Sequence, residues 1–199
     1  PYQFRPALKL IHADEPRILI ADSVGVGKTI EAGLIIKELQ ARSELENVMI
    51  ICPKPLVTER KWELEMKRFD EDFVPLAGPE LRQVISDTNR DGEWPVRYSK
   101  TIVPYSILDS RTYNSDNGKK SKFFGLKDLD PAPHFDLVII DEAHHIKNPN
   151  TYAYQAAQMF CDNAESIVLL TATINLTRRR DIGNSTLRKP EMLKVSFTP

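Results

Sequence analysis

The sequence predicts an α/β fold in which a parallel β-sheet carries helices on both faces. Short apolar runs, typical of buried strands, alternate along the chain with segments whose apolar residues recur at helical spacing. Polar clusters follow the predicted strands, and the carboxyl ends of parallel strands share the sheet edge where ligands bind. A loop with two glycines joins the first of these strands to the first long helix. Together these observations indicate a sheet that binds a ligand at one edge.

The composition sets limits on what the chain can be. Its 199 residues suffice for one large domain or two small ones, and the formal net charge of −1 gives no overall basic signal. Any nucleic-acid site must therefore be local. Cys52 and Cys161 stand far apart in apolar contexts and are interpreted as buried thiols. We find no membrane span and no signal peptide, and a chain that begins with Pro1 is expected to be an excised piece of a longer one.

The first half of the chain contains two strand–helix units. Residues 2–12 carry apolar side chains at helical spacing and predict a short helix. The apolar run 18–21 predicts a strand, and the pattern of 28–42 predicts the helix that follows it. A second buried strand at 48–52 is stopped by the prolines that come next, and residues 56–69 again have helical spacing.

The second half is less regular at its beginning. Leu81–Ile85 is interpreted as a strand and residues 89–93 as a turn. The polar composition of 114–121 predicts a loop, so a mobile insertion is expected around 113–122. The remaining predicted elements are a strand at 101–103, a short helix at 105–113, a strand at 135–140, a helix at 152–161 and a strand at 167–170.

The loop after the first strand has the pattern of a phosphate-binding loop. Glycines let backbone N–H groups approach phosphate oxygens, and the start of the next helix adds unpaired donors. Lys28 is expected to reach the β- and γ-phosphates, and the Thr29 hydroxyl to bind Mg²⁺. Asp22 replaces the first glycine of the general pattern, so an ordinary strand–helix turn is the alternative. The residues expected to hold the phosphates are Asp22, Ser23, Val24, Gly25, Val26, Gly27, Lys28 and Thr29.

A pair of carboxylates, Asp141-Glu142, ends the strongly apolar strand 135–140. Asp141 can hold the Mg²⁺ that bridges the β- and γ-phosphates, and Glu142 can orient and deprotonate the attacking water. The alternative is a solvated acidic turn at the end of a strand. We expect these two residues and Lys28 to be the catalytic groups of nucleotide hydrolysis.

Histidines and threonines form the next clusters. His144 and His145 lack the spaced partners of a zinc site, so His144 is instead expected to contact Thr171-Ala172-Thr173. This contact would couple the state of the γ-phosphate to a bound polymer; alternatively, the threonines cap the following segment. His12 and His134 are interpreted as loop or surface residues.

Five segments in order resemble the motifs of the Snf2-type helicases of superfamily 2, in their RapA-like branch. Tyr2-Gln3 also stands where that family has its adenine-contacting glutamine. The similar segments are residues 21–33 for motif I, 51–56 with Trp62, Glu65 and Phe69 for motif Ia, 101–108 for the Ib region, 141–148 for motif II and 169–173 for motif III. The resemblance covers essentially the whole chain.

This resemblance implies that residues 1–199 are the first RecA-like lobe of a two-lobed motor, whose second lobe lies in the same longer chain. The family uses ATP and Mg²⁺ to translocate along double-stranded DNA and often remodels bound proteins. Gln3 would contact adenine, and His144 with Thr171 would couple the lobes. The lobe alone should bind nucleotide but hydrolyse it slowly, because the second lobe supplies the arginine finger.

The resemblance also bears on partners and location. DNA contacts would be sequence-independent backbone contacts, with Lys54, Tyr105 and Ser106 as candidates, although Lys54 is also readable as a solvated loop lysine. No membrane partner is expected. The location would be cytoplasmic and nucleoid-associated in a RapA-like bacterial protein, and nuclear in a eukaryotic one.

Three positions depart from the family pattern. Ser23 and Val26 replace its usual Glu and Leu, and Ile174 follows Thr173 where the family has proline. Other motors share these motifs, so the motor subunit of a restriction system and an RNA helicase stay open as alternatives. A nucleotide-gated scaffold without sustained turnover is a third, although the intact catalytic residues argue against it.

Overall fold

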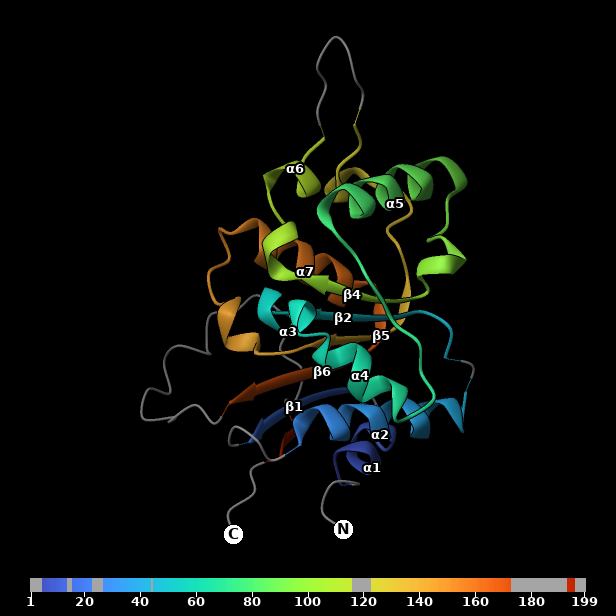
Figure 1. Ribbon diagram of the computed structural model, residues 1–199, viewed down its shortest axis with the longest axis vertical. Coiled ribbons are helices and arrows are strands. Elements are labelled where there is room, and N and C mark those ends of the chain that lie inside the picture. The colour runs from blue at the N-terminus through green and yellow to red at the C-terminus, as the bar shows by residue number, and fades with distance from the viewer. Residues whose placement is uncertain are drawn as a thin grey trace.

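The computed structural model describes residues 5–13, 16–22, 27–43, 45–115, 123–172 and 193–195. Its strands form one seven-stranded sheet in the order β3-β4-β2-β5-β6-β1-β7, and all the pairs are parallel (Figure 1). The strands are β1 (Arg17–Asp22), β2 (Val48–Cys52), β3 (Val74–Pro75), β4 (Lys100–Pro104), β5 (Phe135–Ile140), β6 (Ala164–Ala172) and β7 (Leu193–Val195).

Helices cover both faces of this sheet, which confirms the predicted fold class. The α-helices are α1 (Arg5–Ile11), α2 (Lys28–Gln40), α3 (Lys54–Thr58), α4 (Lys61–Lys67), α5 (Gly78–Asp91), α6 (Ser110–Tyr113) and α7 (Tyr152–Asp162). One hydrophobic cluster joins α1, α2 and α4 to the sheet, and a second joins α5 and α7 to it. Within β2, Ile50 belongs to the first cluster, whereas its neighbours Met49 and Ile51 belong to the second. The alternation places the two clusters on opposite faces.

Helix α2 depends on glycine at two places. Gly27 precedes the helix with φ of 92°, a left-handed conformation that glycine adopts without steric cost. Gly33 lies in the helix against the ring of Phe69, and a Cβ at this position would stand 2.3 Å from the ring atom Cε2. The absence of a side chain at Gly33 therefore lets α2 pack closely against the segment that follows α4.

The prediction of a strand at Leu81–Ile85 is wrong. These residues lie in the middle of α5, where Leu81, Val84, Ile85 and Thr88 are buried at spacings of three and four residues. The helix begins after an extended Ala77, whose N–H donates to Glu80 Oε2 at 2.8 Å, and ends at Gly92 with φ of 78°. A five-residue window showed the short apolar run but not the longer helical period that surrounds it.

Other elements differ from expectation in length. The helix predicted over 56–69 is divided into α3 and α4 at Arg60, whose φ is 54°. Residues 105–113 form two short pieces, a 3₁₀ turn at Tyr105–Ile107 and α6, instead of one helix. Further 3₁₀ turns lie at Val96–Tyr98, Leu126–Asp128 and Ala143–His145. The short strands β3 and β7 were not predicted.

The expected insertion around 113–122 has described residues only at its flanks, because 116–122 lie outside the described ranges. At one flank, a Cβ on Gly125 would stand 2.4 Å from the carbonyl oxygen of Tyr113. The N–H of Gly125 donates to the Ser115 hydroxyl at 2.8 Å. The two ends of the segment are therefore held together by backbone contact.

Both cysteines are buried free thiols, as predicted. Burial raises the pKa of Cys52 to about 12, and it does the same to the pKa of Cys161. Among the described helices, none has the length and apolar character needed to cross a membrane.

Candidate active site

The predicted polar residues that the structure describes lie at one edge of the sheet. All the strands run in parallel, and the arrowheads of β1 and β6 in Figure 1 point to the same side. Asp22 at the end of β1 pairs with Ala172 at the end of β6, and Ala21 pairs with Thr171. On the other side of β6 lies β5, which ends immediately before Asp141. The carboxyl ends of three adjacent strands therefore bring together the residues around Asp22, Thr171 and Asp141.

The described part of the phosphate-binding loop begins at Gly27. Lys28 and Thr29 are partly buried in the first turn of α2, and the backbone of Asp22 ends β1. This arrangement presents the start of a 13-residue helix toward the same edge. The predicted site residues Gln3, Ser23, Val24, Gly25, Val26 and Thr173 lie outside the described ranges, as does Ile174.

Asp141 is the most firmly anchored side chain of the site. The indole N–H of Trp62 donates to its Oδ2 at 3.0 Å, and the backbone N–H of Glu142 donates to its Oδ1 at 2.8 Å. The Tyr105 hydroxyl donates to the carbonyl oxygen of Asp141 at 2.6 Å. Burial raises the pKa of the Asp141 carboxyl above its ordinary value, while the bond from Trp62 works in the opposite direction.

Glu142 stands at a sharp bend of the backbone. Its φ is 51° and its ψ is 46°, a left-handed conformation that is uncommon outside glycine and clusters at functional sites. The bend ends β5 and begins the turn Ala143–His145. As a result the carboxylate turns back, so that its Oε2 lies 3.2 Å from Nδ1 of His144.

His144 connects Glu142 to β6. Its Nδ1 also lies 3.2 Å from the hydroxyl oxygen of Thr171, which is the contact expected from the sequence. Burial, reinforced by the neighbouring His145, lowers the pKa of His144 below its ordinary value. The imidazole is therefore neutral at neutral pH. With its proton on Nδ1, it could donate to one of the two nearby oxygens, Glu142 Oε2 or the Thr171 hydroxyl oxygen.

Sequence reasoning missed the roles of Trp62 and Tyr105 in this arrangement. Trp62 was recognised as part of a motif, but the pattern gave no sign that its indole reaches across to the end of β5. Tyr105 was expected to contact DNA, whereas its hydroxyl bonds to the Asp141 backbone. The other two DNA candidates, Lys54 and Ser106, are exposed to solvent at the same edge. A tryptophan followed 79 positions later by an aspartate carries no local signal of their contact.

The donor atoms present suit a hard divalent cation. Asp141 offers carboxylate oxygens and Thr29 a hydroxyl, which are the kinds of ligand that Mg²⁺ prefers. Both Asp141 oxygens already accept one hydrogen bond, and each keeps a further lone pair for a water or a cation. When bound, Mg²⁺ would neutralise phosphate charge and orient the β- and γ-phosphates.

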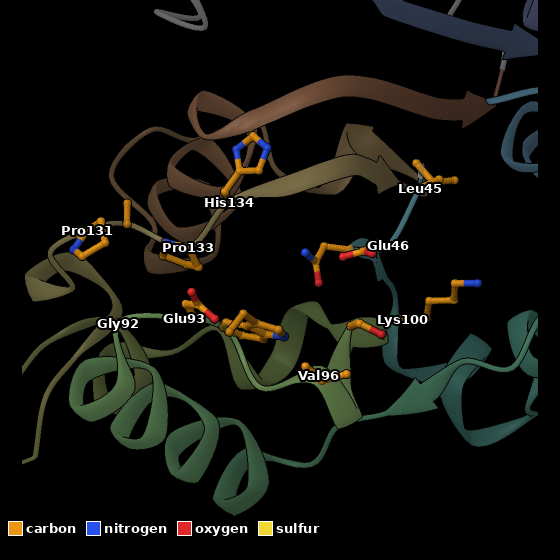
Figure 2. A pocket seen from close by; sticks show the side chains of 13 residues that line it. Leu45, Glu46, Gly92, Glu93, Val96, Lys100, Pro131, Pro133 and His134 are labelled. Atoms are coloured by element: carbon orange, nitrogen blue, oxygen red, sulfur yellow. The ribbon is translucent and has the colours of Figure 1, made fainter. Parts of the chain in front are cut away.

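A separate cavity lies at the opposite, amino-terminal edge of the sheet. Its volume is about 790 Å³, and its walls come from the residues just before β2, β4 and β5 together with the turn after α5 (Figure 2). Lys100, Trp94, Pro133 and His134 are among the residues that line it. Because β5 has six residues, roughly 20 Å of strand separates this cavity from Asp141.

Known proteins resemble the chain in both sequence and fold. A family model of the SNF2-related domain matches residues 7–175. The RNA polymerase-associated protein RapA of Actinobacillus pleuropneumoniae serotype 5b is 32% identical over 186 residues, which cover 87% of this chain and 17% of that protein. RapA of Erwinia tasmaniensis is 31% identical over 184 residues, covering 87% of this chain and 16% of that protein.

A solved structure shares the fold. The Sulfolobus solfataricus SWI2/SNF2 ATPase core, determined in complex with double-stranded DNA, superimposes with a TM-score of 0.61 at 22% identity. The match covers 91% of this chain and 33% of that one. The chain thus spans less than a fifth of the length of the curated relatives. The order of the motifs, the parallel sheet and the match over residues 7–175 show that the chain belongs to the SNF2-related domain family.

Proposed function

We propose that the chain is the ATP-binding first lobe of a DNA-dependent ATPase that translocates on double-stranded DNA and remodels protein–DNA complexes. The curated relatives are RNA polymerase-associated proteins, and the similar solved core was determined with double-stranded DNA. Because this chain spans 17% of such a relative, the second lobe would lie in the rest of a longer protein. As in a RapA-like protein, it would work in the bacterial cytoplasm beside the nucleoid.

The observation that carries the proposal is the linked set Trp62–Asp141–Glu142–His144–Thr171 at the sheet edge that α2 faces. Each neighbouring pair is in contact, at 3.0 Å for Trp62 and Asp141 and at 3.2 Å for both contacts of His144. A solvated acidic turn would not need a buried indole donor on its aspartate. The set supports hydrolysis as well as binding of a nucleotide.

Each residue has a distinct part in the proposed chemistry. Lys28 and the start of α2 bind the phosphates, and Thr29 with Asp141 would hold Mg²⁺. Glu142 orients a water for attack on the γ-phosphate and accepts its proton. His144 stands beside the Glu142 carboxylate and touches Thr171 through Nδ1, so a shift at the phosphate can be transmitted to the end of β6.

Exposed groups at the same edge are candidates for contact with DNA. Lys54 begins α3 just after β2, and Ser106 lies in the turn just after β4. Contacts from such positions would reach the sugar-phosphate backbone and give binding without sequence preference. Tyr105 would contribute through its ring, since its hydroxyl is bonded to Asp141.

Steady-state ATPase activity of the longer protein, measured with and without duplex DNA, tests this function. We expect duplex DNA to stimulate turnover without strand separation, whereas stimulation by RNA alone would favour an RNA helicase. An ATPase that duplex DNA does not stimulate would contradict the proposal.

Lys28→Ala tests the phosphate site itself. The variant should lose nearly all affinity for ATP, because the loop keeps its backbone donors but loses the cation that reaches the β- and γ-phosphates. Binding of a fluorescent ATP analogue measures this directly. The exposed Lys54→Ala is the control and should bind nucleotide as the parent does; equal affinity in Lys28→Ala would overturn the assignment.

A further inference from the structure

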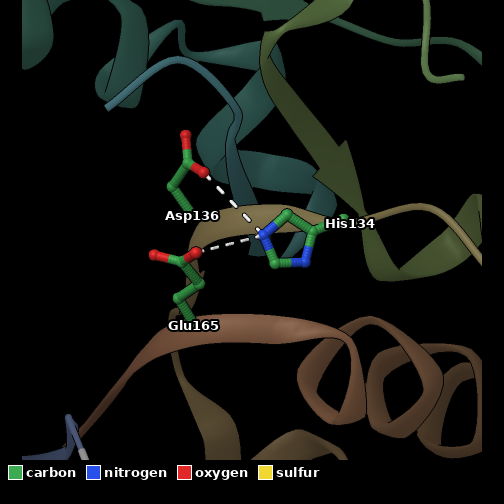
Figure 3. Close-up of side chains that lie close together, drawn as sticks. All are labelled: His134, Asp136 and Glu165. Carbon is green, nitrogen blue, oxygen red and sulfur yellow. Dashed lines mark ion pairs between the residues drawn. The ribbon is translucent and has the colours of Figure 1, made fainter. Parts of the chain in front are cut away.

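Three side chains at the amino-terminal edge of the sheet point their ligand atoms toward one another. They are His134, Asp136 and Glu165, and their donor atoms all lie within 4.8 Å of one another (Figure 3). Nε2 of His134 stands 3.4 Å from Oε1 of Glu165 and 4.0 Å from Oδ1 of Asp136. These three residues, called the trio below, lie near the start of β5, whereas Asp141 follows its end. They therefore have no role in the proposed ATPase chemistry.

The sheet register brings the two carboxylates together. Phe135 pairs with Ala164 and Leu137 with Ser166, so Asp136 of β5 and Glu165 of β6 stand at the same level on adjacent strands. Like charges at such positions repel each other. His134 is the third member, and its imidazole places a nitrogen ligand beside the two carboxylates. A bound cation would turn this repulsion into attraction.

Asp136 is held in a single orientation before any ligand arrives. Its Oδ2 accepts hydrogen bonds from the backbone N–H groups of Glu46 and Asn47, at 2.6 and 2.8 Å. These bonds come from the segment that leads into β2, and they leave Oδ1 directed at His134. The side chain of Asp136 is 18% exposed, whereas those of His134 and Glu165 are 58% and 66% exposed. One fixed ligand and two adjustable ones can therefore close around an ion that enters from solvent.

The two distances from the His134 nitrogen are close to those between ligands of a four-coordinate metal. Ligands about 2.0–2.2 Å from a tetrahedral Zn²⁺ lie about 3.3–3.6 Å from one another. The distance from His134 to Glu165 is already in this range, and the distance from His134 to Asp136 needs to shorten by only a few tenths of an ångström. An imidazole nitrogen with two carboxylates favours Zn²⁺ over Mg²⁺, which prefers oxygen ligands alone.

From this geometry we propose that His134, Asp136 and Glu165 form a binding site for Zn²⁺ at the amino-terminal edge of the sheet. His134 also lines the 790 Å³ cavity, so the metal would sit at the rim of that cavity with its remaining positions open to water (Figure 2). The ion would tie the start of β5 to the start of β6. His134 is an exposed loop residue, as interpreted from the sequence, and the proposal adds a metal-binding role to it.

Metal titration of the protein tests the site. Co²⁺, and then Zn²⁺, is added in the presence of excess Mg²⁺ and without nucleotide, while calorimetry and the visible d–d absorption of Co²⁺ report binding. We expect one ion per chain, the absorption of a tetrahedral nitrogen–oxygen site, and a higher thermal unfolding midpoint with Zn²⁺. His134→Ala and, separately, Glu165→Gln should each weaken binding by tenfold or more. Circular dichroism verifies that both variants fold.

Two matched controls identify the site that binds. His12→Ala removes an exposed histidine that is not a member of the trio, and His144→Ala removes the histidine beside the proposed nucleotide site. Both should keep the parent affinity for Zn²⁺. The proposal is overturned if no ion binds, if His134→Ala and Glu165→Gln bind as the parent does, or if His144→Ala alone abolishes binding. Those results would leave the trio as a surface ion-pair cluster, and none of them would affect the proposed ATPase.

Discussion

Asp141 is fixed by groups from separate parts of the chain. Trp62 from α4 donates to its carboxylate, and Tyr105 from the turn after β4 donates to its carbonyl oxygen. The backbone N–H of the next residue donates to its other carboxylate oxygen. A carboxylate that is held before its ligand arrives loses little freedom on binding. Trp62 and Tyr105 are thus positioning residues for the proposed Mg²⁺–nucleotide site.

Trp62→Phe should weaken Mg²⁺-dependent nucleotide binding by about tenfold, since it removes the donor that orients Asp141 while it keeps an aromatic ring. Leaving the buried carboxylate short of one partner should also cost about 1–3 kcal/mol of the free energy of unfolding. Nucleotide titrations at several Mg²⁺ concentrations, with urea unfolding alongside, measure both effects.

Trp94→Phe is the matched control for this prediction. Trp94 is also buried, but its indole N–H donates to the backbone oxygen of Tyr98, at the opposite edge of the sheet. This variant should lose stability and keep the Mg²⁺ dependence of the parent. Equal Mg²⁺ dependence in the two variants would show that Trp62 does not position Asp141.

Among the elements, α2 has a glycine, Gly33, at the position where the helix packs against Phe69. Gly33 is in a helix interior, where glycine is normally less favourable than alanine by roughly 0.5–1 kcal/mol. The Phe69 ring occupies the space that a side chain would need. The stabilisation from packing α2 closely against the segment after α4 is therefore larger than the cost of having glycine in a helix.

Gly33→Ala should lower the free energy of unfolding by about 1–3 kcal/mol, the cost of overpacking, even though propensity alone predicts a gain. Thermal or urea unfolding gives the sign. Adding Phe69→Leu to the variant should restore part of the loss, because the smaller side chain makes room for the new methyl group. An increase in stability in Gly33→Ala alone would refute the packing argument.

Glu71 lies in the segment between α4 and β3, and its carboxylate joins that segment to two elements. Lys37 of α2 and Lys100 of β4 contact its two oxygens at 2.5 and 2.6 Å, and the Glu71 side chain is only 3% exposed. Although burial alone would raise the pKa of Glu71, the bonds from Lys100 and Lys37 lower it below the ordinary value of 4.5. The ionised form is therefore favoured in the folded protein.

This lowered pKa predicts how stability depends on pH. The contribution of Glu71 is fully present above its ordinary pKa and is lost as the pH falls through the lower folded value. Glu71→Gln should therefore cost about 1–3 kcal/mol at pH 7, and the difference from the parent should shrink below about pH 4.5. Urea unfolding across this range measures it. The exposed Glu59→Gln should change little at any pH, and a constant deficit in Glu71→Gln would contradict the linkage.

At the scale of the whole molecule, the sheet separates two edges with different chemistry. The carboxyl edge gathers the residues of the proposed ATPase, and the amino edge holds the cavity and the His134, Asp136 and Glu165 trio. Strands that are buried on both faces connect the two edges. Binding at either edge can therefore be altered with little disturbance of the other.

A feature of the fold could be predicted from the sequence when the residues that determine it lie close together along the chain. The strand 48–52 was predicted at its observed bounds, since a run of apolar residues is closed by a proline. The helical Leu81–Ile85 was misread, because its period appears only over more than two turns. The contact of Trp62 with Asp141 and the approach of Phe69 to Gly33 join distant positions, so only the folded chain reveals them.

The central claim is that Asp141 and Glu142 form a nucleotide-hydrolysing site, and Glu142→Gln in the longer protein tests it most directly. The amide keeps the size of the side chain but cannot accept a proton from water. We predict that the variant binds ATP as the parent does, while its ATPase activity in the presence of duplex DNA falls by a factor of about 100 or more. A variant that binds ATP normally and still shows DNA-stimulated turnover would contradict the claim.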